Sequence, residues 1–551
     1  MEVLLSVLEV VEDLLEEITK FLQPIDMNRY LYSLIYLLFF IVFDGKSQAY
    51  GYYKDVLKFS NNFSGGSARI QGIGGASSSL GGDISSISIN PAGLGFFNKG
   101  VFSITYDYTN KSYDVRYLGD PSNNKTIDNT YPSFSNISLV IPLKKKNSYS
   151  LSGNNTCPDC SKFNFGISFN NVRSYNKNRT YSGYNDYNSI IDYFLYDAQG
   201  IALSQISNSD PISGIGLLQE AYDHYLINPD TDLPGSYFSF VGGYPFQSEE
   251  ITYEGSISKL SFSGGTNSND KMFLGFGFNF YRISYLENRK YIEDQFEILD
   301  SSGNWVQESI LNYLELNDFF KINGSGASLS LGVIIKPIDQ LNIGINFESK
   351  TKYSLSEEMF SELETSYFDY YFQPEDTVLG AAVSGTAKNI SDYKFTSPSK
   401  ISIGSSYFFK KFGFISADID LINYTNSRIE SFDFNAYPDN AEINYYYKSL
   451  AINYRLGIEA RYKKFYFRYG YNFLADPARG IISNDVDNSI VKNSLGFGFL
   501  SKKFSLDFAY IFHKKENINI SPYNVPINQP VATFNDKIKS LVFTLSYRLN
   551  K

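Results

Sequence analysis

Alternating hydrophobic and polar positions run through most of the chain from about residue 100 to the end. The alternation is clearest in residues 274–281, 341–348, 465–472 and 541–550. In the first of these segments one face holds only Leu and Phe, and the other holds Gly, Asn and Tyr. A period of two places successive side chains on opposite faces of a β-strand. The pattern therefore predicts an all-β protein.

The same pattern, interrupted by turn residues, divides the chain into fourteen predicted strands. They are 100–116, 133–144, 161–174, 249–264, 271–292, 318–337, 340–354, 391–408, 412–430, 441–462, 463–475, 490–501, 503–519 and 535–549. Short turns are expected at Thr266–Asp270, Pro337–Gln340, Lys410–Lys411, Lys463–Lys464 and Lys502–Lys503. Long connections are expected near 117–132, 175–248, 293–317, 355–390, 431–440, 476–489 and 520–534. An even number of strands with alternating short and long connections is typical of a bacterial transmembrane β-barrel.

A soluble β-sandwich would also alternate, with its polar face in water. Composition favours the membrane, because the chain has 46 Tyr, 46 Phe and 41 Gly, and the apolar face is mostly aromatic. The mean hydropathy of −0.23 argues against a helical membrane protein. In lipid an open sheet edge would leave backbone groups without partners, so the sheet is expected to close. We therefore expect a 14-stranded antiparallel barrel over residues 100–551.

The N-terminal 49 residues have the features of an export signal. An apolar run of thirteen residues, Leu31–Phe43, follows Arg29 and precedes Ser47-Gln48-Ala49, a small-x-small cleavage pattern. The run is too short for a membrane-spanning helix of ~20 residues. Residues 1–26 are acidic, which is the wrong sign for an export signal, so we expect Met27 to be the true start and 27–49 the signal peptide. A genuine amphipathic cytoplasmic helix over 1–26 is the alternative.

Charge and cysteine content exclude several functions. The net charge is −10 with no basic run, so nucleic acid is not an expected partner. Cys157 and Cys160 are the only cysteines, and in an oxidising compartment we expect a disulfide across this turn. No metal and no cofactor are expected, because His224 and His513 lie far from these cysteines in sequence. Nor is an enzyme expected: His513 shares an inward face with polar residues, where a structural histidine is commoner than a catalytic one.

Between the signal and the first strand lies a Gly- and Ser-rich stretch with two further motifs. Gly74-Gly75-Ala76 is followed by Gly82-Asp83 and then by Asn90-Pro91-Ala92. This order resembles the N-terminal hatch of the outer-membrane long-chain fatty-acid transporter family (FadL/TodX type). Two further matches are Ser397–Ile401 and Asp418–Tyr424, and Ala221–Leu226 looks like versions seen in Bacteroidetes members. A departure from the family pattern is the C-terminal Lys551 in place of an aromatic residue.

The resemblance implies a barrel whose lumen is closed by residues 50–99, with short helices in the extracellular loops. A ligand would land on an apolar groove between these helices, move to an inner pocket and leave through a lateral gap beside a kinked strand. Asn170-Asn171 is the candidate kink, because the alternation through Phe169 breaks there; ordinary strand termination is the alternative. Helices are expected over Ser189–Gln205 and Ile212–Ile227 of the long 175–248 connection.

Four residues of the second helix are candidates for the groove: Ile215, Leu218, Tyr222 and Tyr225. They are spaced as an apolar stripe, and they could equally pack on the core of their own loop. We therefore expect passive uptake of long-chain fatty acids or other small hydrophobic molecules across the outer membrane of a Gram-negative bacterium. The alternative is a barrel of the same fold that binds other outer-membrane proteins in a secretion or assembly complex.

Overall fold

The computed structural model describes residues 51–60, 65–143, 162–207, 216–299, 305–306, 309–479 and 489–549. The strands are β1 (Val101–Tyr117), β2 (Asp120–Leu143), β3 (Lys162–Ser174), β4 (Lys177–Tyr184), β7 (Tyr244–Ser268), β8 (Met272–Leu299), β10 (Leu311–Ile338), β11 (Leu341–Glu348), β12 (Lys352–Phe372), β13 (Thr377–Gly385), β14 (Asn389–Thr396), β15 (Lys400–Phe408), β16 (Gly413–Ile422), β17 (Arg428–Ser431), β18 (Ala451–Tyr462), β19 (Phe465–Leu474), β20 (Ile490–Leu500), β21 (Phe504–Ile520) and β22 (Ala532–Arg548), with the two-residue strands β5 (Asn228–Pro229), β6 (Tyr237–Phe238) and β9 (Trp305–Val306).

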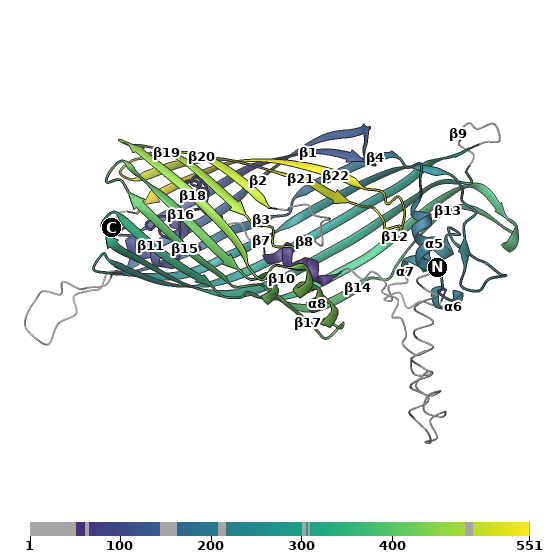
Figure 1. Ribbon diagram of the computed structural model, residues 1–551, viewed down its shortest axis with the longest axis horizontal. Helices are drawn as coiled ribbons and strands as arrows, with labels where there is room; N and C mark the ends of the chain where they lie inside the picture. Colours follow the sequence, from purple (N-terminus) through teal and green to yellow (C-terminus); the bar gives the residue numbers. More distant parts are fainter. Residues whose placement is uncertain are drawn as a thin grey trace, which may run out of the picture. The chain divides into compact units, whose positions relative to one another are not determined.

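Neighbouring strands pair antiparallel round a closed barrel, because β22 pairs with β1 from Ala532↔Tyr117 to Arg548↔Val101 (Figure 1). The main sheet has 20 segments. Several segments continue one another in the wall: β3 with β4, β11 with β12, β13 and β14 with β15, and β16 with β17, while β9 is a small flap on β8. The wall therefore has fourteen strands, and the predicted all-β barrel is confirmed.

The apolar faces of the strands point outward. Phe278 is 50% exposed and its neighbour Asn279 only 1%; likewise Leu329 is 50% exposed and Ser330 2%. The same arrangement recurs round the wall, where the outward residues include Leu274, Phe276, Ile401, Ile403, Tyr454, Leu456, Phe465, Phe467, Leu541, Phe543 and Leu545. A closed barrel with an exposed apolar belt and a polar interior is the pattern that a lipid bilayer requires.

The short turns occur where the sequence predicts them. The hairpins of β15 with β16, β18 with β19 and β20 with β21 turn at the expected lysine pairs. Between β7 and β8, Asn269 and Asp270 have φ values of 53° and 56°. The Lys271 amide donates to the Ser268 carbonyl oxygen at 3.1 Å, so Asn269 and Asp270 are the central positions of a tight turn. Positive φ at both positions matches the twist of the strands, and Asn and Asp tolerate it better than most residues do.

Several expected boundaries are wrong. The predicted connection 117–132 is mostly strand, because β2 begins at Asp120 directly after a turn at Leu118-Gly119. The predicted connection 355–390 is the β12–β13 hairpin, and much of 293–317 belongs to β8 and β10. These extensions carry no continuous outward apolar face: on β12 and β13 the apolar side chains Leu363, Tyr367 and Leu379 pack instead into a buried cluster. The sequence pattern therefore resembles a loop.

The predicted strand 441–462 is also partly wrong, because its first residues belong to helix α8 (Tyr437–Tyr446). The stretch is rich in Tyr, which favours strands, but Pro438 in the first turn and Asp439 beside it favour a helix start. The predicted strands 391–408 and 412–430 are each interrupted, the second by η5 (Tyr424–Asn426). Among the described residues no helix is both long enough and apolar enough to cross a membrane.

The other helices lie in the N-terminal segment and in the connections. The first group is η1 (Tyr52–Lys54), α3 (Asp55–Ser60), α4 (Ala68–Gly72), η2 (Ile84–Ile87) and η3 (Pro91–Phe96). The second group is α5 (Ile190–Ala198), α6 (Leu203–Ile206), α7 (Gly216–Asp223) and η4 (Gln373–Glu375). The expected helix 189–205 is thus two helices. Of the expected helix 212–227, whose described part begins at residue 216, only Gly216–Asp223 is helical, and residues 224–227 form a turn. Helices α5–α7 gather at the same end of the barrel as β13 (Figure 1).

Candidate functional site

The N-terminal segment, residues 51–60 and 65–99, contacts inward-facing residues on many wall strands. Its α4 helix begins at Ser67, whose hydroxyl accepts a hydrogen bond from the Ile70 amide. The Ala68 amide donates to Thr544 Oγ1 of β22 at 2.7 Å. Asn164 of β3 donates to the Leu94 and Phe97 carbonyl oxygens at 2.6 and 2.9 Å. Across the barrel, Asn342 of β11 donates to the Ser79 carbonyl oxygen at 3.1 Å, so strands from both halves of the wall hold the segment.

The Gly74-Gly75-Ala76 motif lies directly against the wall. Gly74 and Gly75 have φ values of 67° and 81°, which few residues other than glycine adopt. The Gly74 amide donates to Ser494 Oγ at 3.1 Å, and Ser416 Oγ donates to the Ala76 carbonyl oxygen at 2.9 Å. A Cβ atom on Gly470 of β19 would lie only 1.9 Å from the Gly74 nitrogen. Glycine on both sides permits this approach of two backbones.

Asp83 and Asn90 each close a local turn. Asp83 accepts hydrogen bonds from the Ser67 hydroxyl at 2.9 Å and the Ser85 amide at 3.0 Å, and so caps η2. Asn90 caps η3 by accepting from the Ala92 amide at 3.1 Å, and Pro91 occupies the first turn, where its missing N–H costs nothing.

Asn90 also ties two parts of the segment together, because its side-chain amide donates to the Ser78 carbonyl oxygen at 2.6 Å. The wall residues that face Asn90 and Ala92 are again glycines. A Cβ on Gly332 of β10 would lie 1.9 Å from Asn90 Oδ1, and one on Gly275 of β8 would lie 2.2 Å from the Ala92 nitrogen. The two motifs of the segment are thus matched by glycines of the wall.

Charged residues that the sequence did not single out anchor the segment more firmly. Glu459 of β18 is 1% exposed and contacts Arg69 of α4 at 3.1 Å and Arg468 of β19 at 2.8 Å. Arg468 in turn pairs with Asp507 of β21 at 2.8 Å. These residues occupy the polar faces of otherwise apolar strands. A charged residue on the polar face of a predicted strand is the signal that the sequence offers for such anchors. This signal does not show which residue each of them contacts.

The wall is discontinuous beside Asn170 and Asn171. Pairing of β3 with β2 ends at Asn170↔Asn136, and the described residues of β2 before Asn136 pair only with β1. On the other side of β3 the register with β7 shifts between Asn171 and Arg173, so that Val172 is an extra residue. A bulge of this kind bends a strand and interrupts pairing. A cavity of about 450 Å³ lies here, lined in part by Tyr131, Asn171 and Tyr253.

Inside the barrel, a chamber of about 310 Å³ lies between the N-terminal segment and the wall. Gly65, Gln71, Gly74 and Gly75 line it from the segment. Its wall side includes residues of β1, β3, β20 and β21, and Asn171 lines both this chamber and the cavity at the break. Polar and charged side chains outnumber apolar ones in its lining, but Val172, Ile422 and Leu474 give it apolar surface as well. The chamber is therefore of mixed character and adjoins the gap in the wall.

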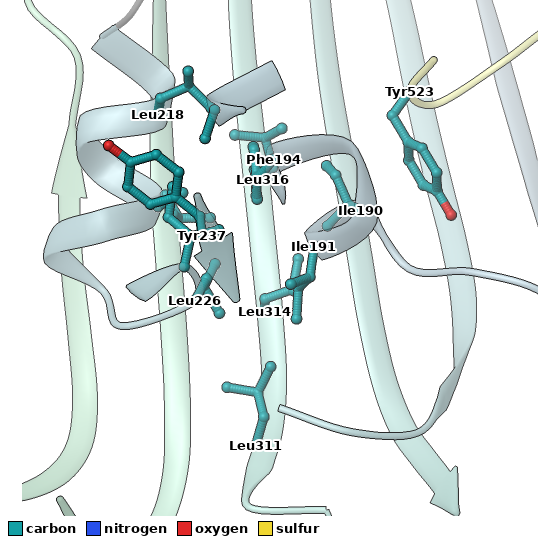
Figure 2. Packing of buried hydrophobic residues seen from close by; sticks show 14 of the residues in the cluster. Ile190, Ile191, Phe194, Leu218, Leu226, Tyr237, Leu311, Leu314, Leu316 and Tyr523 are labelled. Atoms are coloured by element: carbon teal, nitrogen blue, oxygen red, sulfur yellow. The ribbon is translucent and has the colours of Figure 1, made fainter. Parts of the chain in front are cut away.

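The long connection forms its own hydrophobic cluster. Ile190, Ile191 and Phe194 of α5 pack with Leu218 of α7 and with three leucines of β10 (Figure 2). Leu218 is 5% exposed, so it faces this cluster, and Tyr222 packs against it. Tyr225 lies beyond the end of α7 and donates from its hydroxyl to Glu375 at 2.5 Å.

None of these three candidate groove residues lines the cavity of about 360 Å³ in this region. That cavity is lined by residues that the sequence did not single out, among them Ile191, Leu195, Val241 and Phe296. Ile215, Cys157 and Cys160 lie outside the described residues, as do residues 1–50. The described residues hold no cluster of three or more His, Cys, Asp or Glu suited to a metal.

The barrel resembles several solved structures. A FadL homologue from Pseudomonas aeruginosa matches with a TM-score of 0.50 at 12% identity, covering 89% of this chain and 100% of that one. The Pseudomonas putida toluene transporter TodX matches with a TM-score of 0.48 at 13% identity, covering 89% and 100%, and the Ralstonia pickettii toluene transporter TbuX with 0.44 at 12%, covering 89% and 99%. No protein-family model and no curated protein sequence matches the chain. At such low identity the likeness is one of fold: this chain has the fold of the FadL homologue.

Proposed function

We propose that this protein takes up small hydrophobic molecules, such as long-chain fatty acids, across the outer membrane of a Gram-negative bacterium. The observation that carries the proposal is the break in the wall beside Asn171, next to a chamber that the N-terminal segment borders. A closed wall would force a ligand past the segment into the periplasm. A gap between β2 and β3 offers a lateral route into the membrane instead.

The route has three stages. The ligand first meets the loop cavity, whose Ile191, Leu195, Val241 and Phe296 provide apolar surface, so this cavity takes the place of the groove expected on α7. It then reaches the chamber and leaves at the β2–β3 gap. The loop end faces outside, because long connections are extracellular in such barrels.

Residues 51–99 act as a hatch in this proposal, with Gly74 to Ala76, Asp83 and Asn90 to Ala92 as its gating turns. The test is a reversible lock. The hydroxyls of Ser79 in the hatch and Ser406 of β15 hydrogen-bond to each other, so Ser79→Cys with Ser406→Cys places two thiols within bonding reach. Cys157 and Cys160 are replaced by Ser in the background.

Uptake of a labelled long-chain fatty acid by cells is measured before and after reduction of the lock. We expect no uptake with the disulfide closed and recovery on reduction, while Ser79→Cys alone behaves like the unmodified barrel in both states. Equal uptake in the closed and reduced states would rule out hatch gating.

A second candidate function is binding of other outer-membrane proteins in a secretion or assembly complex. One observation favours it: the β12–β13 hairpin exposes Phe368 (65%), Val378 (59%) and Val383 (61%) at the loop end. Exposed apolar surface outside the membrane often marks a protein contact. Co-purification from native membranes in mild detergent distinguishes the two, because a partner lost on Phe368→Ser, with uptake unchanged, would favour the complex.

A further inference from the structure

The chamber has the wrong lining for a purely hydrophobic ligand. It contains six basic side chains, Lys111, Arg173, Lys400, Arg455, Lys492 and His513, and three carboxylates, Asp107, Glu348 and Asp420. Some of these are balanced in place. Glu348 lies 2.9 Å from Lys259, just outside the lining, and 3.4 Å from Lys400. Arg455 lies 2.5 Å from Asp420 and 3.6 Å from Asp418, so three cations here face three carboxylates. The remaining groups gather on β1, β3, β20 and β21, on the side of the wall break.

Three of the cations, Lys111, Arg173 and Lys492, form a cluster that also includes the neutral imidazole of His513. Arg173 lies near enough to repel both lysines, and both lysines repel a proton on His513. Two carboxylates act on the cluster. Asp536, outside the lining, attracts Lys111 most strongly but is already paired with Arg179 at 2.7 Å, and Asp107 of the lining attracts both lysines. The Nδ1 atom of His513 is buried and has no hydrogen-bond partner among the described residues.

Neither Lys111 nor Arg173 forms an ion pair with a carboxylate of the described residues; each is satisfied by neutral oxygens instead. Lys111 donates to the Asn176 carbonyl oxygen at 2.5 Å. Arg173 donates to the carbonyl oxygens of Leu57 and Lys58, both at 2.9 Å. An enclosed cation that has only neutral acceptors gains from an anion, because a charge-assisted hydrogen bond is roughly twice as strong as a neutral one.

The charge count suggests the number of charges on the ligand. We assign the negative charge of Asp107 to the neighbouring Lys492. Lys111 and Arg173 then contribute two positive charges that no carboxylate of the lining balances. A monoanion would neutralise one of them and leave the other enclosed, which is costly in a region of low dielectric. A dianion balances both.

We propose that the chamber binds a dianionic head group, such as a phosphate monoester or a dicarboxylate, carried by the amphiphilic ligand of the proposed uptake route. This inference rests on the proposed function for the apolar part of the ligand. Because Arg173 holds the hatch helix α3 through Leu57 and Lys58, the arriving dianion competes with those carbonyl oxygens. Binding then releases α3 from the wall beside the break.

The test compares three ligands with the same eight-carbon chain: octyl phosphate, octanoate and octanol. Binding to the full barrel in uncharged maltoside detergent is measured by calorimetry at pH 7.0, where the phosphate monoester is mostly a dianion. We expect octyl phosphate to bind about tenfold more tightly than octanoate, and octanoate more tightly than octanol. Inorganic phosphate, which has no chain, should compete with octyl phosphate.

Variants Lys111→Gln and Arg173→Gln should each remove most of the tenfold preference while octanol binding stays the same. Lys290→Gln is the matched control, because this exposed lysine pairs with Glu315 on the outer part of β10. Folding of each variant is checked by heat-modifiable mobility on gels. Where a variant fails to fold, the salt dependence of ligand binding to the unmodified barrel tests the inference instead. The affinity for octyl phosphate must fall more than that for octanoate or octanol as the salt concentration rises.

Equal affinity for all three ligands would overturn the dianion inference and leave uptake of hydrophobic molecules standing. A preference for octanoate over octyl phosphate would overturn it as well. Binding of inorganic phosphate without any gain from the alkyl chain would support the anion chamber and count against the proposed hydrophobic ligand. If none of the four compounds binds, both proposals fail.

Discussion

Asp418 Oδ2 accepts a hydrogen bond from the Ser78 backbone amide at 2.8 Å, joining β16 to a residue 340 positions earlier in the chain. The same oxygen accepts from the Ser77 amide at 2.8 Å. One buried carboxylate therefore holds the turn between the Gly-Gly-Ala and Asn-Pro-Ala motifs against the wall. The sequence placed Asp418 in a family-like stretch but gave it no role.

Asp418→Ala should release this turn without unfolding the barrel. Two hydrogen bonds to a charged acceptor are worth about 1.5–3 kcal/mol each, whereas the pairing of the wall strands is untouched. Arg455 keeps Asp420 as its partner, so no cation is left alone. Hydrogen exchange over residues 65–99 should rise at least tenfold, while Glu315→Gln, which lies away from the segment, should not change it. Unchanged exchange in Asp418→Ala would show that the turn is held by other contacts.

Deletion of Val172 should close the gap in the wall. Asn171 pairs with Ser258 and Arg173 with Ile257, so removing the residue between them restores a regular register on β7. If the bulge opens the lateral route, uptake of labelled fatty acid should fall severalfold with the barrel still folded. Retained uptake in the deletion variant would mean that the ligand leaves by another path.

Phe278→Arg should destabilise the barrel, whereas Phe368→Arg should not. Both side chains are exposed, at 50% and 65%, but Phe278 belongs to the apolar belt of β8 and Phe368 to the hairpin beyond it. A cationic side chain facing the middle of the bilayer costs about 2–4 kcal/mol, and almost nothing in water. Urea unfolding from lipid vesicles measures the difference. Similar losses in both variants would place the hairpin in lipid.

Acidification should loosen the connection that carries α7. His224 Nδ1 and Nε2 lie 2.8 and 2.7 Å from the hydroxyls of Thr365 and Ser384, and burial lowers the pKa of His224 below its ordinary 6.5, with Asp223 opposing this in part. The neutral imidazole therefore stabilises the fold above pH 6.5, and this stability is lost as pH falls toward the lowered pKa. Hydrogen exchange over residues 216–227, expressed relative to the intrinsic exchange rate at each pH, should rise between pH 7.5 and 5. In His224→Ala it should already be high at pH 7.5 and change little on acidification.

The local pattern was sufficient for the barrel because lipid imposes a simple rule. Each outward position, such as Phe276 or Phe278, must be apolar, and each inward one, such as Asn279, need not be. Outside the bilayer that rule disappears. The β1–β2 and β12–β13 hairpins therefore looked like loops, and α8 looked like a strand because its start signals were outweighed by its tyrosines.

The sequence by itself determined the strands of the apolar belt, their turns, and the two motifs of the N-terminal segment with their capping residues Asp83 and Asn90. These depend on neighbours within a few positions. Only the tertiary structure decided which wall residues meet that segment, such as Glu459 with Arg69, and which basic residues share one chamber. Lys111, Arg173, Lys492 and His513 come from four strands spread over some four hundred positions. Closure of the barrel brings them together, and no local pattern records which strands will face one another across a lumen.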